Sequence, residues 1–395
     1  MKLRVYEAFA GYGSQRLALE RLKRQYPDFD YEVVMISEID RYAISAYQSV
    51  HGDCPNYGDV SKIDYSKTPS FDLMTYSYPC TDISAAGQQK GLSEGSGTRS
   101  SLLWECRRAI EAKHPRFILM ENVRALTQKK FMPEFKKWQE FLVSQGYVNY
   151  WQILNAKDYG IPQSRDRVFM VSICGGGSYV FPQSFTLRKR LRDILERKVS
   201  EEYYLKPHQV ERIIAHCERK VSEGCGFKTN FRTADGISGA IKTKEGSREY
   251  DTYIVEPIVW IDGFNVMEDG SSRTIKANYG KTGCVNLMRQ GTFGSSEVIE
   301  IKASGVDVNY RIRKLTPTEC FRLMDVDDIS IQRMLNSKYP QITKSGLVLL
   351  KPIPKTQLYK LAGNSIVVSC LYHIFEQLFI PYLTDGNEEP KTNEQ

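Results

Sequence analysis

The stretch FDLMTYSYPCTDIS, residues 71–84, runs from an apolar segment through a Tyr-Pro pair to a cysteine, Cys80. The apolar part is typical of a buried β-strand. Proline is tolerated at strand ends and in turns but not in central strands, so the sequence predicts that Cys80 lies just past the carboxyl end of this strand. Because open α/β sheets bind ligands beyond that end of their strands, the thiol is a candidate functional group.

The same alternation of apolar strand and amphipathic helix fills the first half of the chain. The predicted strands are KLRVYEAF (2–9), YEVVMISEID (31–40), FDLMTYSYP (71–79) and PRFILMENV (115–123), with helical segments between them. This order predicts βαβ units, an α/β fold and a mostly parallel sheet. Near-continuous apolar runs such as FILM indicate a sheet that is covered on both faces. Two strands that flank KDYGIPQSR (157–165) are expected to end this half of the chain.

The rest of the chain has a different character. Residues 186–310 are rich in Gly, Ser and Thr and contain short β-like runs, which predicts a separate strand-rich module. Helical patterning returns after Leu315, and the polar tail, residues 384–395, is expected to be disordered.

The composition excludes several classes of protein. The nine cysteines are an odd number without a C-x-x-C pair, and the five histidines show no metal-ligand spacing, so neither a disulfide framework nor a metal site is expected. The chain contains no apolar run of about 18 residues and no signal-peptide pattern at its start, which predicts an intracellular protein. The net charge of +7 permits an anionic partner without requiring one.

Three features at the predicted carboxyl edge of the sheet favour a cofactor that carries a nucleoside. In FAGYG (9–13), Gly11 and Gly13 would let a ligand approach the backbone closely. Glu38 ends the second predicted strand, where a carboxylate can accept hydrogen bonds from ribose hydroxyls. Asp59 follows the presumed third strand and could accept the amino group of adenine. Each feature alone is equally typical of a tight turn, a surface acid or a helix N-cap.

The kind of cofactor follows from what the glycine loop lacks. A dinucleotide fingerprint needs a third glycine for close helix–strand packing, and this chain has Arg16 there. S-adenosylmethionine carries no pyrophosphate and therefore fits the loop better than a nicotinamide dinucleotide.

A second group of residues suits covalent activation of a pyrimidine ring. Glu121 ends the strand PRFILMENV and would emerge beside Cys80 if the two strands are neighbours, and QSRDR (163–167) sends Arg165 and Arg167 toward the same rim. Attack by a thiolate on carbon 6 of cytosine converts the ring into an enamine that can accept a methyl group at carbon 5. A carboxyl group on ring nitrogen 3 and an arginine on the carbonyl oxygen would stabilise the developing charge.

These motifs together resemble the DNA (cytosine-5-)-methyltransferase family of the prokaryotic or phage type. The resemblance covers the chain outside the middle module and the tail. Six motifs in family order carry it: FAGYG (9–13), SYPCTDIS (77–84), ENV (121–123), QSRDR (163–167), RKLTPTECFRLM (313–324) and GNSIVV (363–368). The resemblance implies a Rossmann-like S-adenosylmethionine-dependent fold, with a discontinuous catalytic and cofactor-binding domain of residues 1–185 plus 311–383. The inserted residues 186–310 would form the target-recognition domain.

The resemblance also implies a role for individual residues. Cys80 would be the nucleophile, Glu121 would contact the ring nitrogen, Arg167 would hold the carbonyl oxygen, and Arg165 would support the loop or contact a phosphate. The residues that would line the cofactor pocket are Phe9, Gly11, Gly13, Glu38, Ile39, Asp59, Pro79, Leu102 and Asn364. Ile39 stands where many members carry an aromatic residue, so apolar packing on adenine is retained without stacking.

Extraction of the target base from the duplex predicts that residues 84–100 form a mobile lid over the site. Ser84, Ala86 and Gln88 of this lid are expected to face DNA, although Ala86 replaces a serine that fills the gap of the flipped base in some members. Thr81 likewise replaces the usual glutamine. Thr274, within Arg273-Thr274-Ile275, resembles the short Thr-Leu signature of the recognition domain, and an exposed strand is the alternative reading.

Three other functions are alternatives to methylation of duplex DNA. A tRNA cytosine-5 methyltransferase of the same family keeps the chemistry, but its branch has a smaller recognition module than the space between residues 186 and 310. A non-catalytic DNA-binding module would not need the chemical residues, and a nicotinamide-dependent oxidoreductase would need the third glycine. A monomer in the bacterial or phage-infected cytoplasm is expected, with a cognate restriction endonuclease acting separately or not at all.

Overall fold

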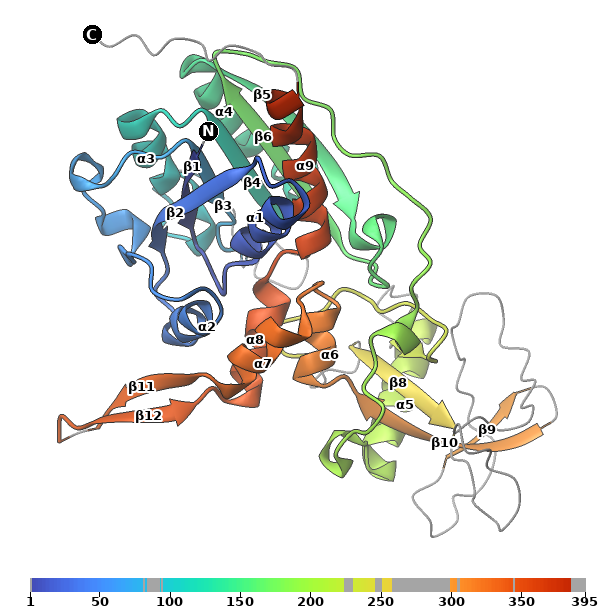
Figure 1. The fold of residues 1–395 in the computed structure, drawn as a ribbon. Helices are drawn as coiled ribbons and strands as arrows, with labels where there is room; N and C mark the ends of the chain where they lie inside the picture. The colour runs from blue at the N-terminus through green and yellow to red at the C-terminus, as the bar shows by residue number, and fades with distance from the viewer. Residues whose placement is uncertain are drawn as a thin grey trace, which may run out of the picture.

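The computed structural model describes residues 2–80, 82–83, 93, 95–223, 230–245, 251–257, 299–303, 306–343 and 345–384. Within these residues the main body is a six-stranded sheet in the order β2-β1-β3-β4-β6-β5 (Figure 1). Its strands are β1 (Lys2–Ala8), β2 (Asp30–Ser37), β3 (Leu73–Tyr76), β4 (Phe117–Val123), β5 (Tyr147–Asn155) and β6 (Asp166–Cys174). The first four strands in chain order pair in parallel, and β6 pairs antiparallel with both β4 and β5. The predicted α/β fold with a mostly parallel sheet is confirmed.

Helices cover both faces of this sheet, as the apolar strands predicted. The covering helices are α1 (Ser14–Gln25), α2 (Arg41–His51), α3 (Glu105–Lys113), α4 (Met132–Ser144) and α9 (Val368–Thr384). Leu19 of α1 and Phe375 of α9 share one buried cluster with Val5 of β1. The next residue of β1, Tyr6, faces the opposite cluster, which contains Trp138 of α4. This alternation follows from the two-residue period of side chains along a strand.

The β5–β6 hairpin brings the QSRDR motif to the carboxyl edge of the parallel strands. Its turn contains the short 3-10 helix η5 (Ala156–Tyr159) and residues 160–165. Because β6 lies between β4 and β5, Arg167 pairs with Val123 in the antiparallel register of β4. Glu121 lies two residues before Val123, which makes it the diagonal neighbour of Arg167.

The middle of the chain forms a smaller four-stranded sheet among the described residues, in the order β7-β8-β10-β9. Its elements are α5 (Pro207–Ser222), β7 (Asn230–Arg232), β8 (Thr252–Pro257), β9 (Ile299–Ala303) and β10 (Val306–Lys314). Helix α5 was not predicted, because only strand-like runs were sought here. Its Val210, Ile213 and Ile214 pack on the sheet with the spacing of one helix face. The expected domain boundary at residue 311 falls inside β10.

The chain after β10 returns to the main body through α6 (Pro317–Arg322), α7 (Asp328–Asn336) and α8 (Lys355–Asn364). Between α7 and α8 it also forms the hairpin β11 (Lys338–Ile342) and β12 (Val348–Pro352), which projects from the body (Figure 1). The purely helical pattern expected after Leu315 is therefore wrong for this segment. The expected disordered tail lies outside the described residues apart from Thr384, which ends α9.

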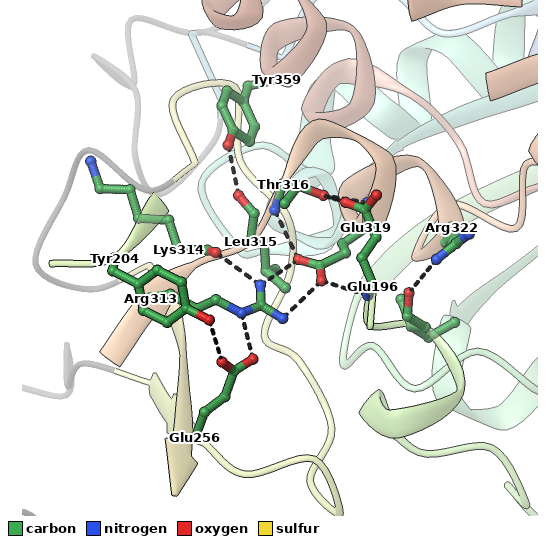
Figure 2. Close-up of polar contacts among 11 residues, drawn as sticks. Glu196, Tyr204, Glu256, Arg313, Lys314, Leu315, Thr316, Glu319, Arg322 and Tyr359 are labelled. Carbon is green, nitrogen blue, oxygen red and sulfur yellow. Dashed lines mark hydrogen bonds and ion pairs between the residues drawn. The ribbon is translucent and has the colours of Figure 1, made fainter. Parts of the chain in front are cut away.

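A buried arginine joins the small sheet to α6. Arg313 of β10 is fully buried, and its guanidinium donates to Glu319 of α6 at 2.8 and 2.9 Å and to Glu256 of β8 at 2.6 Å. Figure 2 shows that the two carboxylates reach it from opposite sides. The Tyr204 hydroxyl donates to Glu256 at 2.8 Å, and the Glu196 amide donates to Glu319 at 2.9 Å. The network therefore fixes β8, β10, α6 and the segment around residues 196–204 to one another.

No helix within the described residues is both long and apolar enough to span a lipid bilayer.

Candidate active site

The loop between β1 and α1 contains the two glycines of FAGYG. Gly11 has φ 59°, and a Cβ added there would meet nothing within 4 Å, so the backbone is open to a ligand as predicted. Gly13 does not match the prediction. A Cβ on Gly13 would lie 2.5 Å from His51 Nε2 and 2.7 Å from the Tyr47 ring, so this glycine is needed for packing against α2. Phe9 also has a positive φ, of 56°, which is rare for a bulky side chain and is held by the surrounding structure.

Glu38 fixes this loop to the end of β2. Its Oε2 accepts a hydrogen bond from the Gly11 amide at 2.9 Å, and its Oε1 accepts from the Ile39 and Asp40 amides at 2.8 Å each. Burial raises the pKa of Glu38, and the hydrogen bonds from the backbone amides oppose that rise. A carboxylate has about four acceptor positions, so ribose hydroxyls can still bind beside the backbone amides.

Two predicted contacts of the adenine ring differ in their surroundings. Ile39 is 72% exposed beside Glu38, so its side chain is available to a ligand. Asp59 does not follow a strand of the main sheet: the chain before it makes only an isolated bridge between Ile36 and Asn56. Its Oδ1 instead accepts from the amide of Ser61, at 3.0 Å, at the start of a 3-10 helix. These contacts lower the pKa of Asp59, with the Ser61 hydroxyl contributing most.

The remaining predicted cofactor residues lie on three separate elements. Pro79 is half-buried in the loop after β3, and Leu102 is half-buried in the 3-10 helix η3 (Arg99–Leu103). The Ser100 hydroxyl donates to the Pro79 carbonyl at 2.7 Å, which holds η3 against the Cys80 loop. Asn364 ends α8 with an exposed side chain.

Cys80 lies beyond the end of β3, as predicted, and is half-buried. The amide group of Asn122 donates to the Tyr78 carbonyl at 3.1 Å, so the ENV motif of β4 also positions the loop that carries the thiol. Burial raises the pKa of the Cys80 thiol. The positive charge of Arg167 lowers this pKa, and the negative charge of Glu121 raises it further. The raised pKa favours the thiol over the thiolate.

Glu121 and Arg167 form a buried ion pair at the same edge. Arg167 Nε lies 3.0 Å from Glu121 Oε1, and the two side chains are 18% and 5% exposed. The Ser77 hydroxyl donates a short hydrogen bond to Glu121 Oε2. Arg167 also donates to the Asp166 carbonyl at 2.8 Å. A carboxyl group, a guanidinium and a thiol thus lie together in one partly buried site, where electrostatic interactions between charged groups are strong.

Arg165 is brought to a different environment from Arg167. Its side chain is buried, and its guanidinium donates to the carbonyls of Ile241 at 2.8 Å, Gly363 at 2.9 Å and Ser365 at 2.7 Å. Of the two roles expected for Arg165, support of the surrounding chain matches these contacts. Contact with a phosphate does not, because the buried guanidinium faces backbone carbonyls.

Several expected DNA contacts lie outside the described residues. These are Ser84, Ala86, Gln88 and Thr274, together with Thr81 and most of the predicted lid of residues 84–100. The described part of that lid includes Ser100, which donates to the Pro79 carbonyl at the base of the Cys80 loop.

Sequence reasoning did not single out the residues that hold the site in place. Ser77, Asn122 and Ser100 fix the Cys80 loop and Glu121, and Gln163 and Tyr12 connect more distant segments. Four of them lie inside a quoted motif and Ser100 ends the predicted lid, so membership of these segments was the available signal. Their partners are far away in the sequence, and no pattern of residues indicates such pairs.

The comparisons with known proteins give the class to which this α/β chain belongs. The family model for C-5 cytosine-specific DNA methylases matches residues 3–380, and the chain belongs to this family. It is therefore a DNA cytosine-5 methyltransferase, and the family uses S-adenosylmethionine.

Individual relatives agree over nearly the whole chain. The chain is 33% identical to the type II methyltransferase M2.ScrFI of Lactococcus lactis subsp. cremoris, over 95% of this chain and 99% of the relative. It is 28% identical to the orphan methyltransferase M.SPRI of Bacillus phage SPR, over 98% of this chain and 100% of the relative. The crystal structure of S. pombe Dnmt2 methyltransferase has the same fold, with a TM-score of 0.62, 17% identity and coverage of 96% of this chain and 99% of that one.

Proposed function

We propose that the chain transfers a methyl group from S-adenosylmethionine to carbon 5 of cytosine in a specific duplex DNA sequence, through base flipping and a covalent Cys80 adduct at carbon 6. The observation that carries this proposal is the Glu121–Arg167 ion pair, 3.0 Å between Oε1 and Nε, whose charges act on the Cys80 thiol. The family membership supplies the substrate class and the reaction, and the details of the mechanism are our inference.

The residues of the β1–α1 loop fit S-adenosylmethionine. The open space beside Gly11 admits a ligand to the backbone, and Glu38 offers a carboxylate at the end of β2. We propose that these two residues hold the cofactor with Phe9, Ile39, Asp59, Pro79, Leu102 and Asn364. When bound, the cofactor supplies an electrophilic methyl group.

Cys80 supplies the nucleophile in this proposal. The Cys80 thiol gives its proton to solvent water, and the sulfur forms a bond to carbon 6 of the flipped cytosine while the carbon 5–carbon 6 double bond opens, which leaves carbon 5 electron-rich. Carbon 5 would then take the methyl group, with S-adenosylhomocysteine as the leaving group. Loss of the carbon-5 proton to water and departure of the sulfur as thiolate would restore the double bond. Arg167 favours the thiolate, since its positive charge lowers the pKa of Cys80.

Glu121 and Arg167 stabilise the ring while it is attacked. Glu121, as a carboxylic acid, would donate a hydrogen bond to ring nitrogen 3, where electron density gathers, and Arg167 would donate to the carbonyl oxygen. Ser77 and Arg167 both contact the Glu121 carboxyl group and so orient it before the substrate arrives. Such preorganised groups need no rearrangement at the moment of reaction.

The middle module, residues 186–310, is proposed to read the DNA sequence, since sequence is read by side chains at base edges in the grooves. Action as a monomer, separately from any cognate restriction endonuclease, also stays a prediction.

The test uses the whole chain with tritiated S-adenosylmethionine and either duplex DNA or tRNA, followed by trapping on duplex DNA that contains 5-fluorocytosine. We expect tritium to enter DNA and a covalent adduct to form with the wild type but not with Cys80→Ser. Incorporation into tRNA alone would overturn the DNA substrate. An adduct with Cys80→Ser, or none with the wild type, would overturn the covalent mechanism.

A further inference from the structure

Arg165 lies where three distant parts of the chain meet. It comes from the turn before β6, and its guanidinium donates to the carbonyls of Ile241, Gly363 and Ser365. Ile241 belongs to the middle module, and Gly363 and Ser365 flank Asn364 at the end of α8. A single buried side chain therefore touches both the recognition module and the segment that carries a proposed cofactor residue.

Further contacts hold the segment around Ile241 of the middle module against the main body. Gln163, fully buried beside Arg165, accepts a hydrogen bond from the Ile241 amide at 2.9 Å and donates to the Leu323 carbonyl at 2.6 Å. The backbones of Ser164 and Ser238 are joined by a 2.8 Å hydrogen bond. A Cβ on Gly363 would lie 2.4 Å from the carbonyl carbon of Lys242, so α8 packs directly on the module's backbone. This segment of the module cannot shift without moving α8 or the Arg165 turn.

The contact extends to the cofactor loop. The Ser365 hydroxyl donates to the Tyr12 hydroxyl at 2.5 Å, and Tyr12 lies between Gly11 and Gly13 in the β1–α1 loop. Tyr12 is 1% exposed and packs edge-on against Phe321 of α6, so its position is fixed. A continuous chain of buried contacts thus runs from the cofactor loop through Ser365 and Arg165 to Ile241.

We propose that Arg165 is a positioning residue that couples binding of the cofactor to seating of the recognition module on DNA. The proposal rests on the proposed function, since it takes Asn364 and the β1–α1 loop as cofactor contacts. A ligand that orders the loop and Asn364 also orders the carbonyls that Arg165 holds, and through Arg165 the Ile241 segment. Coupling between two binding sites is reciprocal, so DNA must favour the cofactor by the same factor.

Arginine suits this role better than lysine. Its planar guanidinium presents donors in a fixed fork, which can hold carbonyls of separate segments at fixed angles. A lysine keeps the positive charge but is a point donor on a flexible stem, so it would leave part of the junction unsatisfied. Substitution by lysine therefore separates the charge of Arg165 from its geometry.

The experiment measures the affinity of the full chain for target duplex DNA with and without saturating S-adenosylhomocysteine. The ratio of the two dissociation constants is the coupling factor, typically about 5- to 150-fold where two sites are linked. We expect the wild type to show coupling and Arg165→Lys to bring the factor close to one. Arg4→Lys is the matched control, because the Arg4 guanidinium also holds a distant segment through two bonds, both to Asp72, near the amino ends of β1 and β3. Its coupling factor should equal that of the wild type.

A milder variant keeps the proposal testable if Arg165→Lys does not fold. Tyr12→Phe removes only the hydroxyl that accepts the hydrogen bond from Ser365. We expect it to lower the coupling factor, as Arg165→Lys does, but by a smaller amount. No coupling in the wild type, or wild-type coupling in both variants, would overturn the proposal. Equal loss of DNA affinity with and without S-adenosylhomocysteine would show a merely structural role and would also overturn it. Adduct formation on 5-fluorocytosine DNA by the wild type tests the proposed function separately, because it does not depend on the coupling factor.

Discussion

At the scale of single residues, we expect the protonation of Cys80 to set the pH dependence of the proposed reaction. Burial raises the pKa of this thiol, and the attacking form is the thiolate. The thiolate fraction therefore increases with pH up to the raised pKa. We expect the rate of adduct formation on 5-fluorocytosine DNA to rise steadily between about pH 7 and pH 9. A rate that is constant over this range, measured in single turnovers, would contradict a protonated resting thiol.

Glu121 offers a sharper test of the acid role. Glu121→Gln keeps the size of the side chain and removes the carboxyl group that Arg167 and Ser77 orient. We expect kcat to fall by about 100-fold or more, because general acid–base groups contribute on the order of 100- to 10,000-fold. Affinity for S-adenosylmethionine, measured by calorimetry, should stay unchanged. The exposed Glu140→Gln on α4 is the control, and an unaltered kcat in Glu121→Gln would remove Glu121 from the mechanism.

The two glycines of the cofactor loop can be distinguished by the same substitution. Gly13→Ala would place its Cβ 2.5 Å from His51, so we expect the free energy of unfolding to fall by about 2 kcal/mol or more. Gly11→Ala meets no neighbour within 4 Å and should cost only about 1–2 kcal/mol for its positive φ. Its main effect should be weaker binding of S-adenosylmethionine. Chemical denaturation and calorimetry separate the two, and equal effects would contradict the assignment.

At the scale of elements, Arg313 holds the small sheet against α6. Arg313→Met would leave Glu319 and Glu256 without their buried cationic partner. Removal of one member of a buried ion pair costs about 3–5 kcal/mol, and we expect a loss of that order in the free energy of unfolding. Arg24→Met breaks the exposed pair with Glu20 and should cost at most about 1 kcal/mol. A loss below that of the control would show that the network does not hold the joint.

The elements that sequence analysis predicted are those with a strong local pattern. The strands of the main sheet and the helix at residues 14–25 have clear apolar periodicity and clear turn residues, and the structure has them there. Asp59 was expected to follow a strand, whereas the residues before it in the structure form an isolated bridge between Ile36 and Asn56. Helix α5 lies in a region that was predicted to be strand-rich, and the β11–β12 hairpin lies in a region that was predicted to be helical. The sequence analysis did not predict either element. Apolar periodicity within a short segment predicts a single helix or strand well. The average composition of a long region predicts poorly which helices and strands it contains.

At the scale of the whole molecule, the motifs predicted which residues meet but not how they are held. Cys80 and Glu121 came together because the parallel strands β3 and β4 end at one edge, and the antiparallel β6 begins at that edge with Arg167. Arg165 stands only two residues from Arg167, yet it joins its own turn to two segments that lie 76 and up to 200 residues away. Long-range contacts of this kind depend on the completed packing and leave no periodic signal in the sequence. The proposed difference in role between Arg167 and Arg165 therefore rests on the contacts in the structure and not on their motif.

The stability of the whole molecule should depend on a carboxyl group beneath the cofactor loop. Glu7 of β1 is fully buried, its Oε2 accepts from the Tyr47 hydroxyl at 2.7 Å, and its Oε1 has no hydrogen-bond partner among the described residues. Burial raises the pKa of Glu7 from 4.5 to about 7, against the effects of Tyr47 and Arg16. Between these values the folded state keeps a proton that the unfolded state has lost. The free energy of unfolding contributed by Glu7 therefore falls as pH rises through this window.

The Glu7→Gln variant has no ionisable group at this position. It should therefore not show this loss in the free energy of unfolding. We expect its free energy of unfolding relative to the wild type to increase from pH 5 to pH 8, by about 3 kcal/mol at most. His51 acts in the opposite sense, since burial lowers its pKa to about 3 and its contribution to stability rises with pH up to about 6.5. That contribution is common to both proteins and cancels in the difference. Denaturation at four pH values, with the exposed Glu111→Gln as control, gives the result. A difference that is constant with pH would show that Glu7 is ionised throughout and that the buried network accommodates its charge.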